Sequence, residues 1–128
     1  MVEAGLRPVP TRGYMFPEIS VNDLDAKLKT EEKFILLDVR EPFELGYAKI
    51  DDPRLESAPI SHLSQVGIEA LSEAVRAQDV PVYIICHHGS RSAQVTGWLA
   101  QQGWKNVFNV RGGIDEYARK VDSSVGMY

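Results

Sequence analysis

Short apolar runs alternate with segments of helical periodicity along most of this chain. The runs at residues 34–37 and 82–85 contain only apolar or aromatic side chains, and each ends at a residue with reactive or polar chemistry, Asp38 and Cys86 respectively. Runs of this length are typical of strands that are buried on both faces of a parallel sheet. The sequence therefore predicts an α/β fold, a mainly parallel sheet with helices on both faces, in which sites form beyond the carboxyl ends of the strands.

The expected elements follow from apolar spacing and from punctuation by glycine, proline and capping residues. Strands are predicted at residues 34–37, 58–60, 82–85 and 106–110, a helical turn at 41–47, and helices at about 21–30, 65–77, 93–100 and 114–120. The length of 128 residues fits one domain. We expect an N-terminal arm over 1–17, interrupted by prolines, the domain over 18–121, and a C-terminal tail over 122–128.

Composition excludes several classes of function. The single cysteine, Cys86, excludes an intramolecular disulfide and zinc sites built from several thiolates. The net charge of −4 argues against a nucleic-acid-binding surface. No stretch approaches the roughly 20 apolar residues of a membrane span. The first eight residues lack the pattern of a signal peptide, so we expect a cytoplasmic protein without membrane partners.

The segment around Cys86 carries the chemistry. A buried strand delivers this cysteine into a short polar loop that contains Gly89, and a helix starts within a few residues. The N–H groups of such a loop converge on one point, and the helix N-terminus adds partial positive charge that favours an anion. Arg91 adds a permanent cation at the far end of the loop. Helix N-termini and neighbouring cations stabilise a thiolate, so we expect Cys86 to be mostly ionised at neutral pH.

Three segments resemble the rhodanese family of sulfurtransferases in order and spacing. Residues 86–92, CHHGSRS, resemble the family's active-site pattern C-x-x-G-x-R-[ST]. Residues 36–44, LLDVREPFE, resemble its L-[IL]-D-V-R-x-P-x-E stretch, and residues 103–113, GWKNVFNVRGG, resemble its segment that ends in two glycines. The resemblance covers about residues 18–120, and it implies a three-layer fold around a mainly parallel five-stranded sheet.

The resemblance implies sulfur transfer through a persulfide. Cys86 would be the catalytic nucleophile, taking a sulfane sulfur from a donor such as thiosulfate and handing it to a thiophilic acceptor. The loop would bind the substrate sulfur through the N–H groups of residues 87–91, and Arg91 would orient an anionic donor. These substrate-binding residues are His87, His88, Gly89, Ser90 and Arg91. No cofactor is implied, and because the chain has no second cysteine, the persulfide must discharge to an outside acceptor.

The partners implied are small-molecule or protein sulfur donors and acceptors. Residues 121–128 resemble tails of rhodanese domains fused to enzymes that adenylate sulfur-carrier proteins, so a sulfur-carrier or thiol-redox protein is a candidate. Residues 48–57 depart from the family, which usually has a G-H-I sequence after the position of Glu44. The conformation of that segment does not follow from the resemblance.

Other residues are expected to support the loop. Asp38 at a strand end is expected to accept N–H bonds from the loop, and Arg40 to form an ion pair with Glu44 beneath it. The supporting set is Asp38, Arg40, Ser92, Gly112 and Gly113, the two glycines permitting close backbone approach. A run of Cys86, His87 and His88 is too tight for all three to ligate one ion, so we expect no metal, and both histidines to shape the loop mouth.

Two alternatives stay open at this point. One is a non-catalytic rhodanese module that binds a protein. The other is phosphatase or arsenate reductase chemistry, whose loops resemble C-x5-R, whereas only four residues separate Cys86 from Arg91. The loop geometry also predicts a positive φ at Gly89, or a contact there that is too close for a Cβ.

Overall fold

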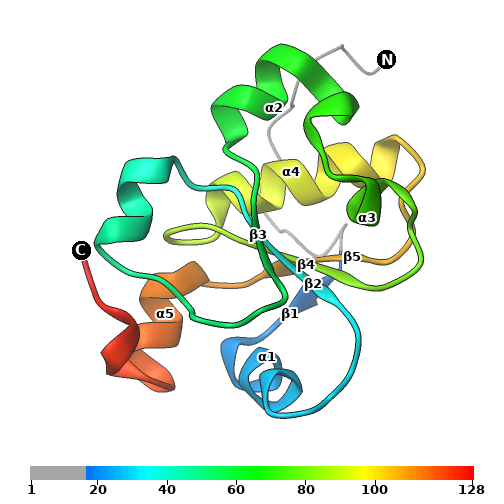
Figure 1. Ribbon diagram of the computed structural model, residues 1–128. Helices are drawn as coiled ribbons and strands as arrows, with labels where there is room; N and C mark the ends of the chain where they lie inside the picture. The colour runs from blue at the N-terminus through cyan, green and yellow to red at the C-terminus, as the bar shows by residue number, and fades with distance from the viewer. Residues whose placement is uncertain (1–16) are drawn as a thin grey trace.

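The computed structural model describes residues 17–128, and its five strands form one parallel sheet in the order β1-β5-β4-β2-β3 (Figure 1). The predicted α/β architecture is confirmed. The proposed arm over 1–17 lies outside the described residues except for Pro17, whose carbonyl accepts a hydrogen bond of 3.0 Å from the Asn109 N–H. The strands are β1 (Glu18–Ile19), β2 (Ile35–Asp38), β3 (Leu55–Ser57), β4 (Val82–Ile85) and β5 (Val107–Val110).

Helices cover both faces of this sheet. In Figure 1, α1 and α5 lie on one face, and α2, α3 and α4 lie on the other. The helices are α1 (Val21–Leu28), α2 (Ile60–Val66), α3 (Glu73–Arg76), α4 (Ser90–Gln101) and α5 (Gly113–Lys120), with 3-10 turns η1 (Pro42–Gly46), η2 (Gly67–Ala70) and η3 (Ser123–Val125).

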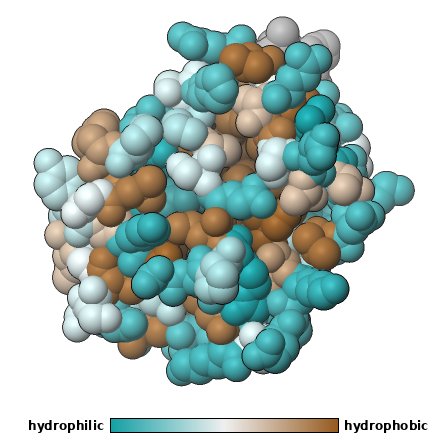
Figure 2. Space-filling view, viewed as in Figure 1, coloured by the Kyte–Doolittle hydropathy of each residue, from teal (hydrophilic) through white to brown (hydrophobic). Residues whose placement is uncertain are grey.

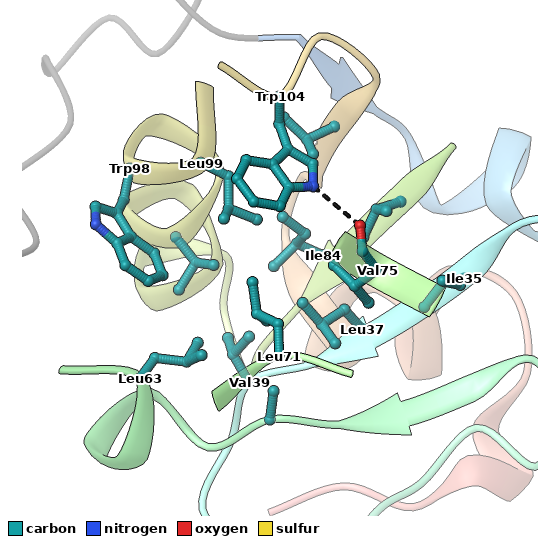
Figure 3. Close-up of a cluster of buried hydrophobic side chains, with 14 of the residues drawn as sticks. Ile35, Leu37, Val39, Leu63, Leu71, Val75, Ile84, Trp98, Leu99 and Trp104 are labelled. Carbon is teal, nitrogen blue, oxygen red and sulfur yellow. Dashed lines mark hydrogen bonds between the residues drawn. The ribbon is translucent and has the colours of Figure 1, made fainter. Parts of the chain in front are cut away.

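The side chains of the central strands alternate between two hydrophobic clusters, as the period of a strand requires. Leu37 and Ile84 point into the cluster beneath α2, α3 and α4, whereas Leu36 and Ile85 point into the cluster beneath α1 and α5. Figure 3 shows the first cluster, in which the Trp104 indole N–H donates to the Val75 carbonyl at 3.1 Å. Burial on both faces explains why these strands read as continuous apolar runs.

The helices next to the sheet match the prediction closely. Ser20 caps α1 by accepting a hydrogen bond from the Asp23 N–H, and α4 and α5 begin at Ser90 and Gly113. The expected helical turn at 41–47 is the 3-10 turn η1, with Pro42 in its first position. These elements formed as expected because local capping and apolar spacing agree there.

Two predictions in the middle of the chain are wrong. The strand expected at 58–60 is β3, three residues earlier, because Pro59 precedes the first turn of α2. The single helix expected over 65–77 is three short pieces: α2 ends at Val66, η2 begins at Gly67, and the Ser72 side chain caps α3 by accepting from the Val75 N–H. The two-residue β1 was not predicted, since it has too few residues to show any periodicity.

The surface is mixed in character. On the face seen in Figure 2, hydrophobic side chains are interspersed with hydrophilic ones. Within residues 17–128, none of the helices is both long and apolar enough to cross a membrane.

Candidate active site

The parallel sheet places Cys86 where a helix begins. Cys86 directly follows β4, is fully buried, and lies between the end of that strand and the first turn of α4. Its Sγ accepts hydrogen bonds from the backbone N–H groups of Gly89 at 3.1 Å and Ser92 at 3.3 Å. Two backbone donors and a helix N-terminus therefore point at one sulfur atom, an arrangement that favours negative charge there.

Gly89 has the backbone conformation that was predicted for it. Its φ is +105°, and a Cβ added there would lie 3.0 Å from the backbone nitrogen of Gly112. A side chain at this position would meet both a backbone strain and a close contact. This conformation turns the Gly89 N–H toward the sulfur while α4 starts at the next residue.

The start of α5 fixes the other side of the loop. The Ile114 N–H donates to the Cys86 carbonyl at 2.9 Å, and the Asp115 N–H donates to the His87 carbonyl at 3.0 Å. Gly113 makes this approach possible, because a Cβ there would collide with the His87 carbonyl oxygen. The predicted close approach to the cysteine loop is found at Gly113, whereas a Cβ at Gly112 would instead meet the Glu116 side chain of α5.

Arg91 is tied to a glutamate from a distant turn. Its two terminal nitrogens donate to the two Glu44 carboxylate oxygens at 2.7 and 2.9 Å, and only 7% of the Glu44 side chain is exposed. The Arg91 guanidinium is the main reason that the pKa of Glu44 falls to about 2, with the Glu41 N–H and the Tyr128 hydroxyl adding to the effect against the opposing effect of burial. Glu44 in turn raises the pKa of Arg91. The pair is ionised at any physiological pH.

The expected ion pair between Arg40 and Glu44 is wrong. The Arg40 guanidinium is fully buried and pairs with Asp38 at 2.8 Å, while it reaches Glu44 only at its backbone carbonyl. The Asp38 carboxylate accepts from the Arg40 backbone N–H at 3.1 Å, so this N–H donor belongs to its own turn and not to the cysteine loop. Both residues organise the turn that carries Glu44, because Arg40 also donates to the Ala48 carbonyl.

The C-terminal tail reaches the rim of the site. The Tyr128 hydroxyl donates to Glu44 at 2.8 Å, and its ring lies parallel to the His87 ring with 3.8 Å between centroids. The Tyr128 backbone oxygen is 2.9 Å from His87 Nε2. Burial lowers the pKa of His87, and the neighbouring His88 lowers it further. Sequence reasoning missed Tyr128, because 84 positions separate it from Glu44.

His88 and Ser90 lie toward solvent. The His88 side chain is 63% exposed, and its Nδ1 lies 3.8 Å from a carboxylate oxygen of Asp115. His87, His88 and Asp115 each offer a ligand atom within 4.8 Å of the others, but the same Asp115 oxygen accepts from Arg119 at 2.9 Å. Ser90 is the exposed first residue of α4. These positions agree with a histidine-lined rim around the loop mouth.

A buried polar pair lies behind the sulfur. Ser92 is fully buried, and its Oγ lies 3.2 Å from Cys86 Sγ and donates to the Asn109 side-chain oxygen at 2.6 Å. Asn109 was not predicted to belong to the site. The signal was present in the sequence: Asn109 interrupts the otherwise apolar strand 107–110, and a polar side chain in such a strand needs a buried partner.

This arrangement suits the storage of an anionic sulfur. The cysteine is held by backbone donors, is closed off from bulk water, and has an arginine at the edge of its loop. The N–H groups that reach Cys86 Sγ are those of Gly89 and Ser92. Binding of an outer persulfide sulfur by the N–H groups of residues 87–91 stays a prediction.

Comparison with known proteins agrees with this geometry. A family model described as the rhodanese-like domain matches residues 20–120. A sulfurtransferase from Allochromatium vinosum is 36% identical over 105 residues, which are 82% of this chain and 91% of that protein. The rhodanese-like/PpiC domain-containing protein 12 of Arabidopsis thaliana, a chloroplastic protein, is 33% identical over 87% of this chain, which spans only 37% of its length.

A solved structure gives the same result. The crystal structure of a rhodanese-related protein from Thermoplasma volcanium superposes with a TM-score of 0.67 at 33% identity, covering 83% of this chain and 94% of that one. The chain described here therefore belongs to the rhodanese-like domain family.

Proposed function

We propose that the protein is a sulfurtransferase that carries a sulfane sulfur as a persulfide on Cys86. The observation that carries this proposal is the pair of backbone N–H bonds to Cys86 Sγ, at 3.1 and 3.3 Å, at the N-terminus of α4. A thiolate is the reactive form of cysteine, and this position stabilises it. The relative named sulfurtransferase, matched over nearly its whole length, supports the same activity.

With thiosulfate as donor, the first step is a displacement at the outer sulfur. The Cys86 thiolate attacks the sulfane sulfur of thiosulfate, a new S–S bond forms, and the old S–S bond breaks with its electron pair leaving on sulfite. The product is Cys86–S–S⁻, with its charge on the outer sulfur. The outer sulfur lies about 2 Å beyond Sγ, toward the loop mouth, and the helix N-terminus stabilises its charge.

In the second step, an acceptor such as cyanide or a thiolate attacks the outer sulfur. The bond between the two sulfurs breaks, and its electron pair returns to Cys86 as a thiolate. Cys86 is fully buried. We propose that the outer sulfur, one bond further along the side chain, points toward the loop mouth. The persulfide therefore brings the transferable atom to a place that an acceptor can approach without reaching the cysteine itself.

The role that we propose for Arg91 is broader than the one that its sequence position suggested. Its pairing with Glu44 balances much of its charge, so we propose that it mainly fixes the edge of the loop and orients a donor through its remaining N–H groups. His87, His88 and Ser90 line the mouth through which a donor and an acceptor pass. The spacing of four residues between Cys86 and Arg91 and this tight pairing both disfavour a phosphatase, whose arginine must bind the phosphate oxygens.

The partners proposed are a small-molecule or protein donor and an external acceptor, such as a sulfur-carrier or thiol-redox protein. We propose that the protein acts in the cytoplasm, as its single reduced cysteine suggests.

Turnover tests this function. The purified protein is incubated with thiosulfate and cyanide, and thiocyanate and sulfite are measured against time. Wild type is expected to release both in equal amounts, and Cys86→Ser to release neither above the uncatalysed rate. Equal rates in the two proteins would reject the proposal, and no turnover in folded wild-type protein would favour the non-catalytic module.

A further inference from the structure

A short polar chain runs from the sheet to the cysteine. The Asn109 side chain is 5% exposed and reaches from β5 to Ser92, whose Oγ donates to Asn109 Oδ1 at 2.6 Å. The same Ser92 Oγ lies 3.2 Å from Cys86 Sγ. The Asn109 amide nitrogen lies 3.4 Å from the Gly89 carbonyl and donates to it. These contacts join β5, the cysteine loop and the first turn of α4.

The direction of the chain follows from the chemistry of its members. The Gly89 carbonyl can only accept, so the Asn109 amide nitrogen faces Gly89 and its oxygen faces Ser92. A serine hydroxyl has a single proton. Because Ser92 donates that proton to Asn109, it presents only lone pairs to Cys86 Sγ.

We propose that Asn109 is a positioning residue that keeps the Ser92 proton away from the Cys86 sulfur. The thiolate is then stabilised by the backbone N–H groups of Gly89 and Ser92, without a third donor from the Ser92 side chain. A sulfur anion with fewer donors is more basic, and the more basic thiolate is the better nucleophile. Asn109 thus makes the Cys86 thiolate less stable but more nucleophilic at Sγ.

The hydrogen bond from Ser92 to Asn109 also favours formation of the persulfide on Cys86, a consequence that rests on the proposed function. In the resting protein the negative charge is on Sγ, whereas in the persulfide it is on the outer sulfur. A hydroxyl proton on Sγ would stabilise the resting thiolate more than the loaded form. Because the Ser92 hydroxyl donates to Asn109 instead, this bias is absent, while the loop N–H groups and the α4 N-terminus still face the anion.

The side-chain hydrogen bonds of Asn109 go to Ser92 and Gly89, and not to the other charged or titratable groups around Cys86. Arg91 is the group that couples electrostatically to Cys86, and Glu44 pairs with it. The remaining groups lie on the loop, on α5, on the tail and at the end of β2, and they are His87, His88, Asp115, Tyr128, Asp38 and Arg40. A shift caused by Asn109 must therefore pass through Ser92 or through the Gly89 carbonyl.

The test is the rate of Cys86 alkylation by iodoacetamide as a function of pH, in wild type, Asn109→Leu, Ser92→Ala and the double variant. Leucine has a similar size but no acceptor, so the Ser92 hydroxyl turns to the thiolate. We expect the midpoint of the rate to move down by about one pH unit, as a hydrogen bond to an anion predicts. The plateau rate at high pH is expected to fall about threefold, because a less basic thiolate is less nucleophilic.

The double variant separates this effect from a loosened loop. In the Ser92→Ala background no hydroxyl remains to turn, so Asn109→Leu is expected to leave the midpoint unchanged. A merely structural role would weaken the Gly89 N–H bond and move the midpoint up in both backgrounds. An unchanged or higher midpoint in Asn109→Leu, or an equal downward shift with and without Ser92, would overturn the proposal.

One further variant guards against a folding defect, and Ser92→Ala alone checks the direction of the Ser92 hydrogen bond. Asn109→Val also removes the acceptor and suits a strand, so it replaces leucine if that variant unfolds in a thermal melt. Ser92→Ala alone is expected not to raise the midpoint, and a rise would show that Ser92 donates to the thiolate in the native protein. Alkylation needs no sulfur donor, so this result stands or fails independently of the turnover assay.

Discussion

Arg91 and Glu44, 47 residues apart in the sequence, join the cysteine loop to the turn after β2 through two hydrogen bonds of 2.7 and 2.9 Å. Glu44 was expected to pair with Arg40, four residues away. The Arg40 guanidinium instead pairs with Asp38 and donates hydrogen bonds to backbone carbonyls. The turn therefore presents its glutamate outward to the loop, and the loop edge depends on a contact between two segments that are distant in the chain.

The Glu44 carboxylate is expected to stabilise the fold in a defined pH window. Its pKa in the folded protein is about 2, below the ordinary value of 4.5. A lowered folded pKa contributes stability above pH 4.5 that is lost as the pH falls toward 2. Glu44→Gln is expected to lower the free energy of unfolding at pH 7 by about 2–3 kcal/mol, measured by urea denaturation.

The difference between Glu44→Gln and wild type should shrink between pH 4.5 and 2. Glu69→Gln, at an exposed position in η2, serves as the matched control and should unfold like wild type. A stability difference that does not change with pH would contradict the ion pair as its cause.

Arg91→Lys is expected to impair thiosulfate turnover even though it keeps the charge. Lysine cannot make the two parallel bonds to Glu44 that fix the loop edge. We expect kcat/KM for thiosulfate to fall by roughly tenfold, and further in Arg91→Ala, in steady-state assays. Arg111→Ala is the control, since that exposed arginine pairs only loosely with Glu18 at 3.5 Å. Wild-type turnover in Arg91→Ala would refute the role given to Arg91.

A pair of glycines at the two ends of α4 separates backbone strain from damage to the site. Gly89 and Gly103 both have positive φ, +105° and +109°, but a Cβ at Gly103 meets no atom within 4 Å. Each alanine substitution is expected to cost about 1–2 kcal/mol of stability. Only Gly89→Ala is expected to slow both alkylation of Cys86 and sulfur transfer. Equal activity in the two variants would mean that the loop tolerates a side chain at residue 89.

Tyr128 is expected to control the ionisation of His87. The stacked Tyr128 ring buries His87, and burial is the largest reason for the lowered His87 pKa. Tyr128→Ala should therefore raise the His87 pKa, which NMR titration of the imidazole signals measures. Tyr128→Phe keeps the ring and loses the hydroxyl's bonds to Glu44 and Arg40, so it should leave the His87 pKa low. A low His87 pKa in Tyr128→Ala would assign its cause to His88 instead.

The sequence predicted the parts of the fold that local patterns determine. The buried runs at 34–37 and 82–85 gave the central strands, and Ser20 marked the start of α1. The prediction for the segment from β3 to α3 was wrong because apolar spacing persists across three short helical pieces. The spacing alone cannot show that the chain turns at Gly67. The short edge strand β3 carries little apolar pattern of its own.

The residues of the candidate site likewise fall into those that local sequence predicted and those that it did not. The cysteine, the turn at Gly89 and the approach of Gly113 lie within motifs whose backbone geometry is local, so they were predicted. The partners of these residues come from elsewhere in the chain, and Glu44, Asn109 and Tyr128 reach the loop only through the sheet topology and the tail. Which side chains pair across such distances depends on which of them already have a nearby partner, as Arg40 has in Asp38.

Sulfur transfer by this protein requires that Cys86 carry a transferable sulfur. Intact-mass measurement after incubation with thiosulfate and removal of excess donor is the most direct test. Wild type should gain the mass of one sulfur atom, and addition of cyanide or a thiol should remove it. Cys86→Ser should gain nothing. Wild-type protein that stays at its original mass, or a sulfur that persists after acceptor is added, would contradict the proposed transfer.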